Sequence, residues 1–394
     1  MTTPARGMAA ARWSTAARLI DAVRDRPGIT RAEATEVLGI SSGTAADLLG
    51  RMRTLELISE QSASTGQRGR PTTILQPHPQ GPLVVAAELG GAGWRVALAG
   101  IDSEPRVEVQ ADELRSGPEQ VVADLADVIG SVGATVGSRV RAVSISVAGT
   151  VSDDMLVQFT TSGWRDVDLS PVIAGFPTHG DDVPMLIGND ATLAGLAEAR
   201  SGAGRGVGTV LHVIVAVGVG GALILDGVPA LGAHGSAGEY GHIPFGTPGQ
   251  QCPCGAEGCW DLVVGGHALA AHHGDPVPRD PVGYALELAR RPADARSRVA
   301  FEKVAEVFGR GIGGLVNLHD PDVVTLGGLG PLLRASAAES FDTAYVSGLM
   351  SFRKSAPPPV LDAHYADDGP LRGAAVRGVD HATSVEALAR WADR

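Results

Sequence analysis

The chain has 394 residues, which is too many for one compact core, so two or three domains are expected. Hydrophobic residues make up 44% and charged residues 19%, which excludes a wholly disordered chain. The net charge of −12 argues against nucleic-acid binding by the molecule as a whole, yet the first 80 residues carry ten Arg and seven acidic residues. A small basic segment on a large acidic body is typical of a nucleic-acid binder controlled by an effector.

The sequence shows no pattern that we interpret as a targeting or membrane element. Arg6 and Arg12 are not followed by the apolar run of a signal peptide. The longest apolar stretch, residues 210–225, is interrupted by His212 and three glycines, which favours two strands and a turn. All three cysteines lie between positions 252 and 259, a poor disulfide framework. We therefore expect a cytoplasmic protein.

The first 60 residues show helical periodicity. Ser14 is predicted to cap a first helix that ends at Pro27-Gly28, and Thr30 is predicted to begin a short second helix. Ser41 or Ser42 is predicted to cap a third helix, in which apolar residues follow the i, i+3, i+4, i+7 pattern. This arrangement predicts a helix-turn-helix, and the alternative is a three-helix packing module with no role in DNA binding.

Two short strands around a basic loop follow, at residues 57–60 and 72–75, and predict a wing. Arg68 and Arg70 lie on this Gly/Pro-shaped loop, a form that lets guanidinium groups enter a narrow minor groove. A plain solvated loop is the alternative. The third helix adds polar groups that can reach bases or phosphates. The candidate DNA-contacting residues are Ser42, Thr44, Arg51, Arg53, Arg68 and Arg70.

Prolines at 77, 79 and 82 mark a linker, after which strands and helices alternate. Strands are expected at 83–89, 94–99, 140–147, 185–188, 210–217, 221–225 and 323–326, and helices at 192–203 and 298–319. Each half of this region opens with a Gly-rich hairpin. The pattern predicts two duplicated α/β lobes that face a cleft.

One motif combines a histidine with every cysteine of the chain. His242, Cys252, Cys254 and Cys259 have the spacing H-x9-C-x-C-x4-C, which supplies the four nitrogen and sulfur ligands of a structural zinc site. Such a site has no open coordination position, so the metal is expected to order a loop rather than activate water. Three unrelated thiols beside a surface histidine are the alternative.

These motifs resemble the ROK family (repressor, open reading frame, kinase). The stretches that carry the resemblance are Glu-Tyr-Gly-His at 239–242, Cys-Pro-Cys-Gly-Ala-Glu-Gly-Cys-Trp-Asp at 252–261, Val-Gly-Val-Gly-Gly-Ala at 217–222, Gly-Asn-Asp at 188–190 and Asn-Leu-His-Asp-Pro-Asp at 317–322. The helices in front, with Gly-Arg-Pro at 69–71, resemble the regulator branch, of the N-acetylglucosamine or xylose repressor type. The resemblance implies an α/β protein: a winged helix-turn-helix, then a two-lobed body of the sugar kinase/actin-like ATPase (ribonuclease H-like) fold.

The resemblance also implies a sugar site in the cleft between the lobes. Asn189 and Asp190 would hydrogen-bond sugar hydroxyls, and in the kinases this Asp is the general base. Glu239 and His242 would hold the anomeric side, with His242 also a zinc ligand, and Asp261 stands where the family usually has a sugar-binding Glu. Side chains of this kind suit polyols. A cap on the following helix is the alternative role for Asn189-Asp190.

Other positions depart from the kinase pattern. Kinases of the family carry Asp-x-Gly-Gly-Thr at the first hairpin, whereas this chain has Glu88-Leu89-Gly90-Gly91-Ala92. Thr161 or Ser162 stands where an Asn commonly precedes the Gly-Trp pair. We therefore expect no catalytic residues and no enzyme activity, with Asp190 as the vestige of the general base.

The predicted domains are a winged helix-turn-helix with linker over 1–78, lobe 1 over 82–190 joined by a C-terminal helix at 383–394, and lobe 2 with its zinc loop over 191–382. We expect a transcriptional regulator, most simply a repressor, of carbohydrate-related genes. Its expected partners are a double-stranded DNA operator, a sugar or sugar derivative, one structural Zn²⁺ per chain and further copies of itself in a homodimer or homotetramer. The alternatives are a sugar kinase with an accessory winged helix and a regulator that has lost small-ligand binding.

Overall fold

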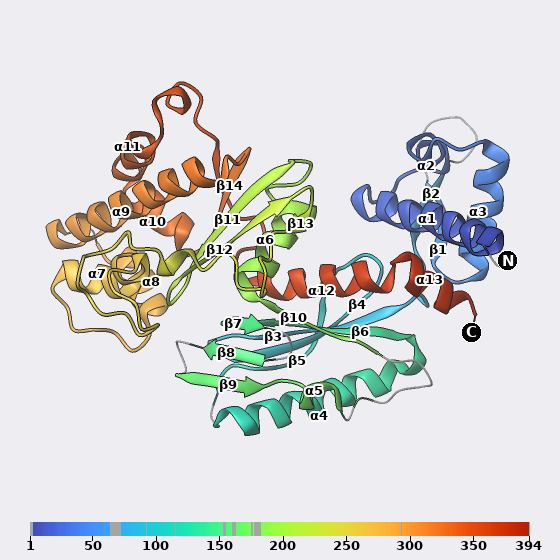
Figure 1. Cartoon of the computed structure of the whole chain (residues 1–394), viewed down its shortest axis with the longest axis horizontal. Helices are drawn as coiled ribbons and strands as arrows, with labels where there is room; N and C mark the ends of the chain where they lie inside the picture. Colours follow the sequence, from blue (N-terminus) through green and yellow to red (C-terminus); the bar gives the residue numbers. More distant parts are fainter. Residues whose placement is uncertain are drawn as a thin grey trace. The chain divides into compact units, whose positions relative to one another are not determined.

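The computed structural model describes residues 3–63, 72–91, 93–114, 116–152, 155–159, 163–174, 176, 183–292 and 294–393. They fall into two units (Figure 1). Unit 1 comprises Met1–Ile145, Leu169–Ile187 and Ala374–Arg394, and unit 2 comprises Ser146–Asp168 and Gly188–Gly373. Unit 1 thus combines the N-terminal helices with the first sheet and the C-terminal helix, and the finer division into three domains stays a prediction.

The N-terminal module consists of α1 (Thr3–Asp25), α2 (Arg31–Leu38), α3 (Ser42–Thr54) and the antiparallel strands β1 (Ile58–Ala63) and β2 (Thr72–Pro77). Thr30 caps α2 through a capping box with Glu33, and Ser41 rather than Ser42 caps α3 by accepting from the Thr44 N–H. The expected cap at Ser14 is wrong, because α1 already begins at Thr3.

The core of this module includes the end of the chain. Helix α13 (Val385–Ala392) adds Leu388 and Trp391 to the apolar cluster of α1, α2, α3 and β2. The Trp391 indole donates to the Leu55 carbonyl at 2.7 Å. A second connection is polar: Arg24 of α1 donates to Asp380 at 2.7 Å and to Ser103 at 2.9 Å. The N-terminal module is therefore joined to the rest of unit 1 by both apolar and charged contacts.

The first five-stranded sheet has the order β10-β6-β3-β4-β5. Its strands are β3 (Leu83–Leu89), β4 (Trp94–Ala99), β5 (Arg106–Ala111), β6 (Val140–Val147) and β10 (Met185–Asn189). Strands β3, β4 and β6 have the predicted bounds. The apolar runs of β3 and β4 are directly bounded by glycine or proline, and β6 is followed by Ala148-Gly149. Helices α4 (Pro118–Val136) and α5 (Pro171–Ala174) pack against each other, with α4 also on β3 and β4, whereas α12 (Gly369–Ala382) contacts β3 and β6 through Val379 and Ala382.

The second five-stranded sheet repeats this topology, with the order β13-β12-β11-β14-β15. Its strands are β11 (Thr209–Val215), β12 (Val219–Leu225), β13 (Val228–Pro229), β14 (Val323–Gly328) and β15 (Val360–Asp362). In each sheet the first strand of the half pairs with the second, and the third lies at the edge beyond it. The duplication that the two Gly-rich hairpins predicted is confirmed in the order of the strands.

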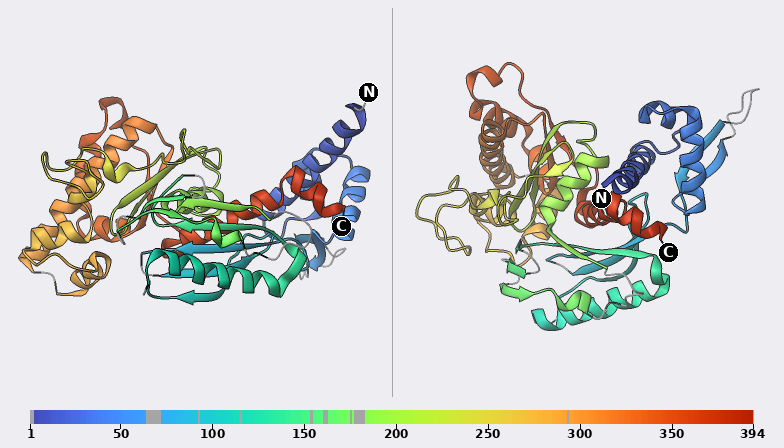
Figure 2. Two further views of the ribbon diagram at one scale, coloured as in Figure 1. Left: turned by 60° about the horizontal axis from the view of Figure 1, so that its bottom comes forward. Right: turned by 45° about the vertical axis from the view of Figure 1, so that its right-hand side comes forward.

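Most helices of unit 2, visible in Figures 1 and 2, contribute to one apolar core together with the second sheet. The helices are α6 (Asp190–Ser201), α7 (Gly266–His273), α8 (Pro281–Arg290), α9 (Ala295–His319), α10 (Gly330–Ser336) and α11 (Ala338–Gly348). Helix α9 runs beside α11 and packs against α7 and α10. A three-stranded antiparallel ribbon, β7 (Thr150–Ser152), β8 (Met155–Phe159) and β9 (Trp164–Asp168), completes the unit.

One helix among the described residues, spanning Pro118–Arg139, is long and apolar enough to cross a membrane by length and composition alone. Its residues Val121, Leu125 and Ile129 are buried, and α4 packs on the first sheet. Core helices commonly combine these properties, so α4 is interpreted as a core helix.

Candidate metal and effector site

The four predicted metal ligands lie on one loop of unit 2, between β13 and α7. His242 ends a 3₁₀ turn (Tyr240–His242), and Cys259 precedes another (Trp260–Val263). Backbone hydrogen bonds fold the intervening segment on itself, including Cys252 N to Ala256 O at 2.9 Å and Gly246 N to Gly258 O at 2.9 Å. Gly255 and Gly258 take the positive φ angles that these tight turns require, at 100° and 67°.

This loop brings the four donor atoms within 4.8 Å of one another. The sulfurs of Cys254 and Cys259 are 3.7 Å apart, and the Cys252 sulfur is 3.8 Å from Nδ1 of His242. A tetrahedron of metal–sulfur bonds of about 2.3 Å has edges of about 3.8 Å. Three sulfurs and one nitrogen at these spacings can therefore hold a metal ion, as the motif predicted.

The other ring nitrogen of His242 faces one predicted effector residue, Glu239. Its Nε2 lies 4.0 Å from Oε2 of Glu239, while Oε1 of Glu239 accepts a hydrogen bond of 2.7 Å from the Thr150 hydroxyl. His242 thus points one ring nitrogen at the cysteines and the other at a carboxylate. Thr150 is a residue of this region that sequence reasoning did not identify.

Asn189 and Asp190 stand where β10 ends and α6 begins. Asn189 caps α6: its Oδ1 accepts from the Thr192 N–H at 3.1 Å, and its Nδ2 donates to the Gly149 carbonyl at 3.0 Å. The capping role weighed for Asn189 is therefore present in the structure. Oδ1 of Asp190 accepts from the Ala191 N–H at 2.8 Å, and the residue is half-buried.

Asp261 is held by the turn of the second Gly-rich hairpin. Its carboxylate accepts from the Val219 N–H, and a Cβ at Gly218 or Gly241 would lie within 2.7 Å of the same carboxylate. Burial raises the pKa of Asp261 above its ordinary value, and the hydrogen bond from Val219 opposes this shift. One oxygen of Asp261 is thus already used inside the protein, and its contact with an effector stays a prediction.

The first Gly-rich hairpin carries an ion pair at Glu88, the position where kinases of the family carry an Asp. Glu88 of β3 lies opposite Arg95 of β4 in the strand register. Oε2 of Glu88 accepts from Nε of Arg95 at 2.9 Å and from Nη2 at 2.5 Å. Both side chains are largely buried, so the guanidinium of Arg95 is held against the carboxylate of Glu88 and neutralises its charge. Ala92 lies outside the described residues, as do Thr161 and Ser162.

The predicted DNA-contacting residues differ in their exposure and in their contacts within the protein. Ser42 and Thr44 are exposed at the start of α3, and the Thr44 hydroxyl lies 2.9 Å from that of Ser41. The Arg51 guanidinium stacks over the Trp13 ring at 4.4 Å. Arg53 lies 3.7 Å from Glu60 with more than half of its side chain exposed. Arg68 and Arg70 lie outside the described residues.

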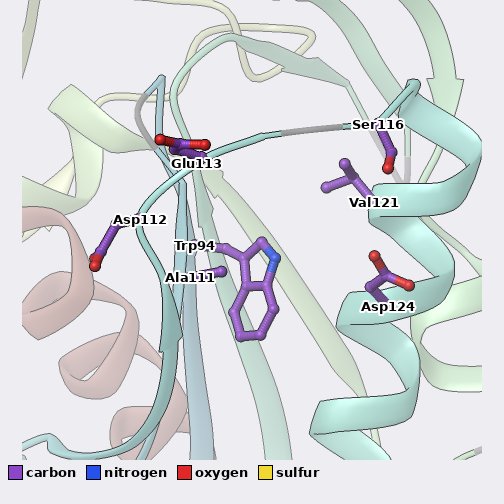
Figure 3. A pocket seen from close by; sticks show the side chains of 7 residues that line it. All are labelled: Trp94, Ala111, Asp112, Glu113, Ser116, Val121 and Asp124. Carbon is purple, nitrogen blue, oxygen red and sulfur yellow. The ribbon is translucent and has the colours of Figure 1, made fainter.

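A separate pocket of about 480 Å³ lies in unit 1, between the edge of the first sheet and α4 (Figure 3). The Trp94 indole lies between the β5 edge and α4. Its lining is acidic and contains none of the predicted effector residues; it consists of Trp94, Ala111, Asp112, Glu113, Ser116, Val121 and Asp124. This pocket therefore offers no support for the predicted sugar site.

Comparison with known proteins supports the resemblance to the ROK family over most of the chain. A model of the ROK family matches residues 84–377. A glucokinase from Streptomyces coelicolor is 26% identical over 266 residues, covering 62% of this chain and 81% of the kinase. A putative xylose repressor from a Caldicellulosiruptor species is 24% identical over 332 residues, covering 78% of this chain and 81% of the repressor.

The fold extends the similarity to the N-terminal module. A crystal structure described as a ROK family transcriptional regulator, homolog of the E. coli MLC protein, superposes with a TM-score of 0.74 and 20% identity, covering 97% of this chain and 99% of that one. The expected fold, a two-lobed sugar-kinase-like body behind helices and strands arranged as a winged helix-turn-helix, is confirmed. The chain belongs to the ROK family.

Proposed function

We propose that the protein is a DNA-binding transcriptional regulator, most simply a repressor, of carbohydrate-related genes. The observation that carries this proposal is the N-terminal module, which precedes the part of the chain matched by the family model. In sequence, the similarity to a glucokinase covers 62% of the chain and the similarity to a putative xylose repressor covers 78%. In fold, the similarity to a ROK transcriptional regulator covers 97% of the chain. The additional part has the helix and strand order of a DNA-binding module.

In this proposal α3 enters the major groove, with Ser42 and Thr44 at its exposed start. Arg53, Arg68 and Arg70 supply charge for phosphate or minor-groove contacts, and Arg51 adds to it from its place over Trp13. One such module presents few basic residues. We therefore propose that two modules of a homodimer or homotetramer bind paired half-sites.

The contacts inside unit 1 support control of the module by the body. Arg24 of α1 joins Asp380 of α12 and Ser103, and Trp391 of α13 joins the end of α3 at Leu55. Helix α12 continues from Gly369, in unit 2, to Ala382, in unit 1. A change at the body is thereby able to reach the DNA-binding helices through one continuous helix.

We further propose that the body binds a sugar or a related small molecule through Asn189, Asp190, Glu239, His242 and Asp261. These residues all belong to unit 2. The metal is proposed to be zinc, one per chain, because three thiolates and one imidazole in a closed tetrahedral set are the ligands of structural zinc. The metal would order the loop that carries Glu239 and His242.

Two contacts argue against nucleotide use, and we propose that the protein is not an enzyme. The Glu88 carboxylate is neutralised by Arg95 rather than available for a metal–nucleotide complex, and the Val219 amide of the second hairpin is bound to Asp261 rather than available for phosphate. Asp190 retains the chemistry of a general base, so the kinase alternative needs a direct test.

A coupled ATP-consumption assay of the purified full chain supplies that test. D-glucose, D-xylose, N-acetyl-D-glucosamine and N-acetyl-D-galactosamine are offered as acceptors, with a ROK glucokinase measured in parallel. We expect no sugar-dependent ATP consumption. Turnover with any of the four sugars, abolished by Asp190→Asn, would establish the kinase instead. A thermal-shift screen with the same sugars separates a sugar-responsive regulator from one that has lost its ligand, since a ligand that binds the folded state raises the Tm.

A further inference from the structure

Thr150 lies at a point in the chain that contacts both Glu239 and, through the preceding residue, Asn189. It begins β7, is half-buried, and its hydroxyl donates to Oε1 of Glu239 at 2.7 Å. The preceding carbonyl, that of Gly149, accepts from Nδ2 of Asn189 at 3.0 Å. A Cβ at Gly149 would lie 2.5 Å from the Gln158 carbonyl, so this close passage requires glycine. Two adjacent residues thus connect the start of α6 to Glu239.

Glu239 in turn faces a metal ligand. Because Thr150 holds Oε1, the carboxylate presents Oε2 to Nε2 of His242 at 4.0 Å. The other ring nitrogen, Nδ1, is the one that lies 3.8 Å from the Cys252 sulfur. An imidazole that binds a metal through Nδ1 carries its proton on Nε2, and a carboxylate on that side favours this tautomer and fixes the ring.

The ribbon that carries Thr150 contacts the metal loop a second time. Arg165 of β9 donates to the carbonyl of Pro253, between two cysteine ligands, at 3.3 Å. In the strand register Thr150 pairs with Gln158, and Gln158 pairs with Arg165. Directly paired residues of antiparallel strands share a face. One row across the ribbon therefore contacts the loop both at Glu239 and at the cysteine turn.

From this geometry we propose that Thr150 is a positioning residue of the metal site. It acts through Glu239: the hydroxyl fixes the carboxylate, and the carboxylate orients His242 toward the three cysteines. The same contact aligns Glu239 for an effector, a consequence that rests on the proposed function, whereas the effect on the metal does not. The ribbon of β7, β8 and β9 thereby connects the metal loop to the start of α6.

The test is the zinc affinity of the full chain, measured by competition with a chromophoric chelator. Thr150→Val removes the hydroxyl at constant shape, and Thr150→Ser restores it. Loss of a group that orients a ligand weakens metal binding by about 10–100-fold, and we expect at least about threefold for Thr150→Val, one step further out. Thr150→Ser is expected within about twofold of the unaltered chain, as is the control Ser152→Ala on the same strand.

A double-mutant cycle separates positioning from a general effect on the fold. If Thr150 acts through Glu239, Glu239→Gln weakens zinc binding, and adding Thr150→Val to it changes the affinity no further. Unaltered affinity in Thr150→Val, failure of Thr150→Ser to restore it, or additive effects of the two substitutions would each overturn the proposal. Failure to bind DNA or sugars would overturn the proposed function, but the comparison of zinc affinities among these variants would still test the role of Thr150.

Discussion

The metal loop and the N-terminal module were both predicted from short sequence motifs, but their side chains are organised in different ways. In the loop, His242 and the three cysteines converge to within 4.8 Å. In the module, Arg51 stacks on Trp13 and Arg53 lies near Glu60, so part of the basic character is used within the fold. The contrast shows that a ligand set is defined by spacing within one loop, whereas a DNA-binding surface depends on which charges remain free.

The metal loop is the place where one substitution should have the largest effect. Replacing Cys252 or Cys254 by Ser removes one of four ligands, so bound zinc should fall from about one per chain to nearly none. Because metal binding at a structural site contributes to folding, the Tm and any response to a sugar should fall together in these variants. Elemental analysis and thermal unfolding of the purified protein measure both. Ser236→Ala, in the same segment, serves as the control, and a Ser variant that keeps stoichiometric zinc would contradict the assignment.

The wing should give the largest effect in the N-terminal module. Replacing Arg68 and Arg70 together by Ala should weaken binding to a genomic fragment by about 10–100-fold at moderate salt and lower the salt slope by up to about two. Fluorescence anisotropy over a range of salt concentrations measures affinity and slope. Arg310→Ala, on an exposed site of α9 in unit 2, removes a charge elsewhere as the control. Equal affinities of the wing variant and the control would refute the wing assignment.

A substitution at Asp190 tests whether the predicted effector residues bind a sugar. Asp190→Asn keeps the size and the oxygen that accepts from Ala191 but removes the charge, so the affinity for the most stabilising sugar should fall by about tenfold. DNA binding by the ligand-free protein should be unchanged. Thermal-shift titration measures the response, with Asp226→Asn in the β12–β13 turn as the control. An Asp190→Asn variant that responds normally would place the effector elsewhere.

Arg51 should give the smallest effect, because its guanidinium already interacts with Trp13. Arg51→Ala removes a cation–π contact of about 0.5–1 kcal/mol, and the free energy of unfolding should fall by about this amount. DNA affinity should fall less than in the wing variant. Urea unfolding and anisotropy together measure the two effects, and Arg51→Lys retains the charge without the planar stack. A loss of affinity larger than that of Arg68→Ala with Arg70→Ala would reverse the ranking.

Much of the fold could be predicted because its signals are local. The bounds of β3 and β4 follow from apolar runs ended by glycine or proline. The start of α1 could not be predicted in this way, since residues 3–13 lack an apolar period and Ser14 resembles a cap. Small residues with high helix propensity extend the helix instead.

In the candidate site too, the features that could be predicted are those with a local sequence signal. The four predicted metal ligands lie within a span of 18 residues, so their spacing could be read from the sequence. The Glu88–Arg95 pair was also available from the sequence, because a short hairpin places these residues opposite each other. The contact of Thr150 with Glu239 joins positions 89 residues apart and has no local signal. Only the folded chain brings the ribbon to the metal loop.

The central claim is that this ROK protein regulates genes by binding DNA through its N-terminal module. The most direct measurement is affinity capture of genomic DNA fragments by the purified full chain, followed by sequencing, with Arg68→Ala/Arg70→Ala as the control. The account predicts a small set of enriched sites with two related half-sites, next to carbohydrate genes, and loss of enrichment in the control. Equal recovery of fragments by both proteins, with no shared sequence, would contradict it.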